Sequence, residues 1–274
     1  MIALVTDSSS QLPAVLRERF GVRVVPLTIV IDGADFTEGV DITDDEFYRC
    51  LAGGATVSTA APAPGRFVDA YDAAAADGAD EILSVHIGSN MSATVDAATI
   101  AARMSPVPVE IVDTGTASFP VACCVWAAGA VVESGGDLAG ASAAARAVAE
   151  GVDNVFVVGA LDLARRGGRL AAGAGAGDGV PVLALHGGEM EVVARAHDVD
   201  AAVDAMGDYV RARVSARPNL AGVGEVGAAQ IGDDLAQRLS SVPEIIEVVR
   251  YGIGPSVGAH TGIGTAGCVF FPTG

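Results

Sequence analysis

The sequence contains no lysine: its 16 basic residues are all arginine, they face 34 acidic residues, and the formal net charge is −18. Without lysine the chain has neither a Schiff-base lysine nor the phosphate-binding lysine of a Walker motif. A strongly acidic surface also disfavours general binding to nucleic acid or to anionic membranes. An anionic ligand must therefore be held locally, by arginine, histidine or backbone N–H groups.

Aromatic residues are scarce, at 5% of the chain, whereas hydrophobic residues make up 51%. This composition excludes a disordered protein and predicts a large core that is mostly aliphatic. Any cavity in such a core would be lined by valine, isoleucine, leucine and methionine, so aromatic stacking platforms for bases are not expected.

Cysteine and histidine are also few, with four of each. The cysteines show no CxxC spacing, and we interpret them as buried free thiols. The histidines show no metal-ligand spacing. We therefore predict neither a metal nor another cofactor. His86, which lies in a predicted strand, is interpreted as a structural residue.

The N-terminus has no basic region and reaches Asp7 quickly, and no apolar run approaches the roughly 18 residues of a membrane span. These features predict a cytoplasmic protein.

Strands and helices alternate up to residue 150, which predicts an α/β domain with a mainly parallel sheet flanked by helices. The predicted strands are Ile2–Thr6, Val22–Ile31, Glu81–Ile87 and Val109–Asp113, and the predicted helices are Leu12–Phe20, Thr43–Leu51, Phe67–Ala76, Ser92–Met104, Phe119–Val132 and Asp137–Glu150. Between them, Gly53–Gly65 is rich in glycine, alanine and proline and is expected to be a shaped loop.

After residue 150 the pattern includes a predicted hairpin, Pro181–Leu185 with Glu191–Arg195. It indicates a second α/β domain with a mixed sheet. The chain is therefore expected to divide into domains 1–150 and 151–274, with a glycine-rich loop, Gly254–Gly264, near its end.

The most informative stretch is Leu83–Thr94, where an apolar strand gives way to small polar residues and then to a helical pattern. In a parallel sheet such a junction forms a crevice whose free N–H groups favour an anionic head group. Three further polar loops, which include Thr59 and His260, are expected to gather at the same edge with Ser89 and Ser92. Arg169, which lies beyond the predicted helix end at Gly167–Gly168, could contact a carboxylate or phosphate.

Two alternative functions remain open. Ser92, His260 and Asp7 could form a serine hydrolase acting on acyl esters, although Ser92 does not lie in a GxSxG motif. Asp7 could instead simply cap the helix that follows it. A nucleotide-binding domain is less favoured, because the chain has no lysine to bind phosphate in a Walker motif.

Six motifs in order resemble the bacterial DegV family across essentially the whole chain. They are Ile2–Ser9, Val25–Leu27, Thr59–Gly65, Ser89–Thr94, Gly167–Arg169 and Gly258–Gly262. The chain departs from the usual family pattern at Ala60, Ala61, Gly88, Ala93 and Ile263.

The resemblance implies a fatty-acid-binding protein that is not itself a catalyst. It implies an acyl chain in an apolar tunnel and a carboxylate near the domain junction, bound by Thr59 and Ser92, with Arg169 and His260 in the surrounding polar network; Ser89 is a neighbouring candidate. The implied partner is an ATP-dependent fatty acid kinase subunit that phosphorylates the bound carboxylate to an acyl phosphate. Transient membrane contact remains open.

Overall fold

The computed structural model describes residues 1–168, 170 and 177–273. The chain forms two compact units. Unit 1 comprises Met1–Thr43 and Thr59–Glu150, and unit 2 comprises Asp44–Ser58 and Gly151–Gly274. The sequence-based division places residues 44–58 in the first domain, whereas the structure groups them with unit 2.

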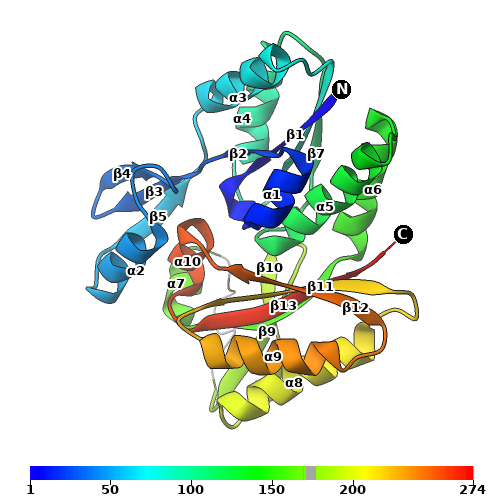
Figure 1. Ribbon diagram of the computed structural model, residues 1–274. Coiled ribbons are helices and arrows are strands. Elements are labelled where there is room, and N and C mark those ends of the chain that lie inside the picture. The colour runs from blue at the N-terminus through cyan, green and yellow to red at the C-terminus, as the bar shows by residue number, and fades with distance from the viewer. Residues whose placement is uncertain (169, 171–176, 274) are drawn as a thin grey trace. The chain divides into compact units, whose positions relative to one another are not determined.

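Unit 1 is built on a parallel sheet with the strand order β2-β1-β6-β7 (Figure 1). Its strands are β1 (Ile2–Asp7), β2 (Arg23–Val25), β6 (Glu81–His86) and β7 (Val109–Asp113). The helices of this unit are the 3-10 helix η1 (Ser8–Ser10), α1 (Ala14–Phe20), α3 (Pro64–Ala76), α4 (Thr94–Ala102), α5 (Phe119–Glu133) and α6 (Leu138–Gly151).

Both faces of this sheet are covered by helices. Ala3 and Val5 of β1 pack in one cluster with Phe67 and Tyr71 of α3 and with the small alanines of α4. Successive strand residues point to opposite faces, so Leu4 points the other way, where α5 contacts β1. Burial on both faces explains why β1 begins as a continuous apolar run, Ile2–Val5, rather than an alternating one.

A three-stranded sheet with the order β4-β3-β5 accompanies unit 1. Its strands are β3 (Thr28–Ile31), β4 (Ala34–Thr37) and β5 (Val57–Ala60). Two expectations were wrong here. The predicted strand Val22–Ile31 breaks into β2 and β3 around Pro26, which has no N–H to donate to a ladder, and the predicted loop Gly53–Gly65 contains β5.

Unit 2 contains a mixed sheet with the order β10-β9-β8-β13-β11-β12, in which β11 and β12 are parallel and the other pairs antiparallel. Its strands are β8 (Asp153–Val157), β9 (Val180–His186), β10 (Glu189–Ala196), β11 (Asn219–Val226), β12 (Ile245–Gly252) and β13 (Thr265–Pro272). Its helices are α2 (Asp44–Ala52), α7 (Leu161–Arg166), α8 (Val199–Arg213), α9 (Ala229–Ser240) and α10 (Pro255–Thr261).

The fold class is confirmed: an α/β unit with a parallel sheet flanked by helices, and an α/β unit with a mixed sheet. The expectation of a loop over Gly254–Gly264 was wrong, because Pro255 begins helix α10 there. The interpretation of all four cysteines as buried was also wrong for Cys50, which is exposed. Among the helices of the described residues, none has the length and apolar character needed to cross a bilayer.

Candidate functional site

The parallel sheet of unit 1 reverses its strand order between β1 and β6. The chain passes from β1 through α1 to β2 on one side, and from β6 through α4 to β7 on the other. Such a reversal opens a crevice beyond the carboxyl ends of the two central strands. Thr6 pairs with Val85, so Asp7 and His86 end their strands side by side. The loops that begin at Ser8 and Ile87 therefore start at this edge.

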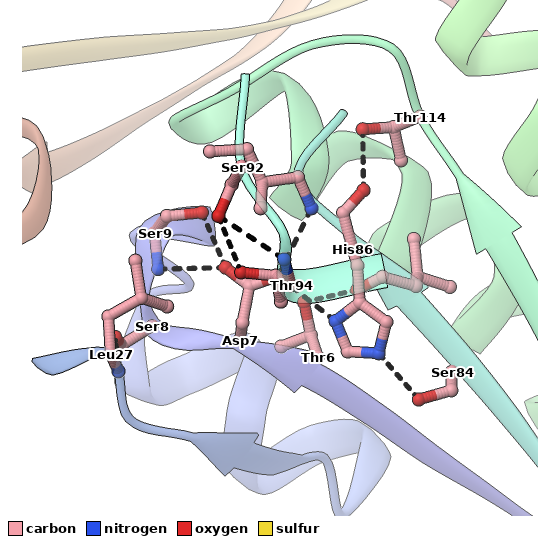
Figure 2. A network of polar contacts seen from close by, with 12 residues as sticks. Thr6, Asp7, Ser8, Ser9, Leu27, Ser84, His86, Ser92, Thr94 and Thr114 are labelled. Atoms are coloured by element: carbon pink, nitrogen blue, oxygen red, sulfur yellow. Dashed lines mark hydrogen bonds and ion pairs between the residues drawn. The ribbon is translucent and has the colours of Figure 1, made fainter. Parts of the chain in front are cut away.

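Asp7 is the polar centre of the edge (Figure 2). Its side chain caps η1, and one carboxylate oxygen accepts the Ser9 N–H at 3.1 Å and also the Ser9 hydroxyl. The other oxygen accepts the Ile87 N–H at 3.1 Å and contacts His86 Nδ1 at 3.0 Å. The interpretation of Asp7 as a cap is confirmed, and the same carboxylate also ties the end of β6 to the end of β1.

A string of buried polar groups continues from Asp7. His86 Nε2 lies 2.6 Å from Ser84 Oγ, and Ser84 Oγ lies 2.8 Å from the Tyr71 hydroxyl. Asp7, Ser84, His86 and Tyr71 are each 0% exposed. Burial raises the pKa of Tyr71 to about 12, although the hydrogen bond with Ser84 acts in the opposite direction.

Ser92 lies in the loop that leaves β6 and is half-buried. Its hydroxyl lies 2.8 Å from Thr94 Oγ1 and accepts the Thr94 N–H at 3.3 Å. Its own N–H donates to the Gly88 carbonyl at 3.1 Å. Ser92 therefore sits at the start of α4 with its hydroxyl already oriented.

Gly88 fits this loop because it has no side chain. A Cβ at this position would lie 2.7 Å from the carbonyl carbon of Gly115 and 2.4 Å from Asn90 Oδ1. The Gly88 N–H donates to the Thr116 carbonyl at 2.8 Å. A side chain at this position would therefore collide with the neighbouring loop.

Ser89 is exposed and bonds away from Ser92. Its N–H donates to Asp113 Oδ1 at 3.1 Å, and its hydroxyl donates to Asp113 Oδ2. Partial burial alone would raise the pKa of Asp113, but the hydrogen bonds from Ser89 and Gly115 outweigh it and hold that pKa below its usual range.

Thr59 lies on β5 rather than in the predicted loop, and it is half-buried. It is the first residue of unit 1 after the segment that belongs to unit 2.

His260 lies on α10 in unit 2 and is half-buried. Gly167, which follows α7, approaches it closely: a Cβ there would lie 2.5 Å from His260 Nδ1. On another side, Tyr48 of α2 donates its hydroxyl to the Ile253 carbonyl at 2.6 Å, just before α10. Tyr48 is a residue that the sequence analysis missed, because its partner lies 205 positions away.

The remaining predicted residue, Arg169, lies outside the described residues. Arg165, four positions earlier in the sequence, forms an ion pair with Asp162 at 2.9 Å.

The contacts of Asp7 do not favour a hydrolase built from Ser92, His260 and Asp7. Asp7 contacts the imidazole of His86, not that of His260. The other nitrogen of this imidazole contacts Ser84, which is fully buried and therefore inaccessible to an ester substrate. The sequence signal for this pair was available: Ser84 and His86 are two positions apart in a strand, and therefore share a face. Within the described residues no group of three or more histidine, cysteine, aspartate or glutamate side chains is placed to hold a metal ion.

Comparison with known proteins relates the whole chain to one family. A family model described as "Uncharacterised protein, DegV family" matches residues 1–273. A DegV domain-containing protein of Streptomyces coelicolor is 36% identical over 273 residues, covering 98% of this chain and 97% of its own length.

Two solved structures extend the comparison. One, described as "Fatty Acid Binding of a DegV family Protein from Thermus thermophilus", has a TM-score of 0.91 and 33% identity and covers 99% of both chains. The other, a DegV fatty acid binding protein from Bacillus subtilis, has a TM-score of 0.88 and 21% identity over 99% of both chains, and shows the shared fold.

Proposed function

This chain belongs to the DegV family, and from that premise we propose that it binds a long-chain fatty acid and presents the carboxylate to an ATP-dependent kinase subunit. The observation that carries the proposal is the similarity to the fatty-acid-binding Thermus thermophilus protein, which extends over 99% of both chains at 33% identity.

The physical chemistry of the chain suits such a ligand. Burying about twelve or more methylenes contributes about 0.8 kcal/mol each, and a mostly aliphatic core accommodates them. The carboxylate is different, because an ion can be buried only when it is hydrogen-bonded. Hydroxyl donors at the edge of a parallel sheet meet that need without lysine.

We assign the carboxylate contacts to Ser92 and Thr59, and place Arg169 and His260 in the surrounding network. Ser92 is the best supported of these residues, since its half-buried hydroxyl lies at the strand reversal beside the N-terminus of α4. Ser89 is a weaker candidate, because its hydroxyl is engaged by Asp113.

In this proposal the chain is a cytoplasmic carrier subunit. The kinase subunit supplies ATP and the phosphoryl-transfer machinery, and the product is an acyl phosphate. Reconstitution with a fatty acid kinase subunit, ATP and the loaded protein should yield acyl phosphate only when this chain is present.

Binding is tested first by mass spectrometry of gently purified protein, which should carry long-chain fatty acid, and by titration with a fluorescent fatty acid. Ser92→Ala and Thr59→Ala should each weaken binding about 10- to 100-fold, which corresponds to the loss of one hydrogen bond to a charged group.

The matched control is Thr99→Ala. Thr99 is exposed on α4, and its hydroxyl donates to the Val95 carbonyl of the same helix. This variant should keep wild-type affinity. Protein that is always empty and has no affinity for fatty acids would refute the proposed function; wild-type affinity in both Ser92→Ala and Thr59→Ala would refute the residue assignment.

A further inference from the structure

The buried string Tyr71–Ser84–His86–Asp7 joins an α-helix to the edge where β1 and β6 end. Figure 2 shows its members Ser84, His86 and Asp7. Ser84 and His86 lie on the same face of β6, and Tyr71 reaches them from α3. All four side chains are 0% exposed, so bulk solvent does not reach their hydrogen bonds. Each proton in the string must therefore find its acceptor inside the protein.

Only one direction of donation satisfies every group. Asp7 already accepts the Ser9 and Ile87 N–H groups and the Ser9 hydroxyl, and as a carboxylate it has no proton to give. His86 must then donate Nδ1–H to Asp7. Its free Nε2 accepts the Ser84 O–H, and the Ser84 oxygen accepts the Tyr71 O–H.

The reverse direction of hydrogen-bond donation leaves one donor without an acceptor. If His86 carried a proton on Nε2, the Ser84 oxygen would accept it, and only one of the Ser84 and Tyr71 hydroxyl protons could lie between their two oxygens. The other hydroxyl proton would then have no acceptor among the contacts of the described residues. A buried donor without a partner is strongly disfavoured. The string therefore fixes one tautomer of His86.

The consequence reaches the loop that carries Ser92. Asp7 holds the Ile87 N–H at 3.1 Å, the next residue is Gly88, and the Gly88 carbonyl accepts the N–H of Ser92 at 3.1 Å. Two hydrogen bonds thus link the Asp7 carboxylate to the backbone of Ser92, so the orientation of this carboxylate affects the position of that backbone.

We propose that His86 is a positioning residue for this loop: as the neutral Nδ1–H tautomer, it orients Asp7 and through Asp7 fixes the backbone from Ile87 to Ser92. The effect on ligand affinity rests on the proposed function of Ser92. The tautomer and the order of the loop do not.

Two substitutions of His86 test the contribution of each imidazole nitrogen separately. In His86→Asn the side-chain amide nitrogen takes the place of Nδ1 and can still donate to Asp7, but the link to Ser84 is lost. In His86→Gln the longer side chain places its amide near Nε2, so contact with Ser84 is kept and the donor to Asp7 is lost. Each variant removes one link of the same buried string, so their unfolding midpoints should fall by similar amounts.

The loop should distinguish the two variants. Amide hydrogen exchange at Ile87 should be within about threefold of wild type in His86→Asn and at least about tenfold faster in His86→Gln, since only the second variant loses the donor to Asp7. Affinity for a fluorescent fatty acid should follow the same order. Nitrogen-15 spectra of histidine-labelled protein, assigned with His86→Asn, should show Nδ1 protonated and Nε2 unprotonated.

Equal exchange at Ile87 in the two variants, or a protonated Nε2, would overturn the positioning role. Should wild-type protein fail to bind fatty acid, the proposed function fails, while the exchange and nitrogen-15 measurements still decide the role of His86.

Discussion

The contact between Tyr48 and α10 offers a quantitative test of how His260 is positioned within unit 2. The Tyr48 hydroxyl donates to the Ile253 carbonyl at 2.6 Å and lies 3.3 Å from the Gly254 carbonyl. It also faces Gly258, on the helix that carries His260. A Cβ at Gly258 would lie 2.0 Å from the Tyr48 oxygen and 2.7 Å from its Cζ. The Tyr48 hydroxyl can therefore occupy this place only because residue 258 is a glycine.

Each partner has its own expected cost. Tyr48→Phe removes the hydrogen bond and leaves a carbonyl without its donor, which should cost about 1–3 kcal/mol. Gly258→Ala would gain about 1 kcal/mol from helix propensity alone, but the contact with Tyr48 is far too close to be accommodated without displacement. The net effect of Gly258→Ala should therefore be destabilising.

Combining the two substitutions gives the coupling free energy between Tyr48 and Gly258. In the Tyr48→Phe background the oxygen is gone but Cζ remains 2.7 Å from the new methyl group, so the clash is only partly relieved. Gly258→Ala should thus cost less in that background than in wild type, with a coupling of about 0.5–3 kcal/mol.

Urea unfolding of the four proteins measures this coupling, and melting temperatures should shift by about 2–4 °C per kcal/mol. Gly207→Ala on α8 is the matched control, because a Cβ there meets nothing closer than 3.5 Å. A stabilising Gly258→Ala, or an equal cost in both backgrounds, would refute the packing argument.

Two further predictions concern titration and thiol reactivity. The folded-state pKa of Asp113 lies below its usual value, so its stabilising contribution is present at neutral pH and is lost as pH falls through that lower pKa. Ser89→Ala should accordingly lower the urea midpoint at pH 7, and the difference from wild type should shrink below about pH 4; a constant difference would contradict this. Of the four cysteines only Cys50 is exposed, and burial raises the pKa of Cys124 to about 12 and also raises the pKa values of Cys123 and Cys268. An aromatic disulfide reagent should therefore titrate one thiol in native protein and all four in denaturant, and rapid reaction of a second native thiol would show that the core opens.

The sequence predicted best those elements whose pattern is local. The strands Ile2–Thr6 and Glu81–Ile87 are mostly apolar and bounded by polar turns, and both lie at the centre of the parallel sheet. β5 was missed because a Gly, Ala and Pro-rich segment has little strand propensity, and it forms through pairing with β3. β13 went unrecognised after a glycine-rich stretch, although it is the central strand that joins both halves of the mixed sheet.

The candidate site shows the same division. The position of Ser92 between a strand and a helix was predicted because a strand, a polar loop and a helix follow each other within Leu83–Thr94. His86 was interpreted as structural, and it is buried. Its partner Ser84 lies in the same strand, but its contact with Asp7 depends on β1 and β6 pairing in register across 79 positions. No local pattern encodes that register.

The position of Thr59 depends most clearly on contacts that no local sequence pattern encodes. It was selected from a motif, yet its place in the fold depends on the segment before it, which leaves unit 1 after Thr43 and returns only at Thr59 itself. Within that segment Tyr48 makes a hydrogen bond across 205 positions, to a carbonyl that any residue at position 253 would supply. A backbone acceptor leaves no trace in side-chain sequence. The excursion is therefore set by tertiary packing, whereas a division of the chain at residue 150 follows local sequence patterns alone.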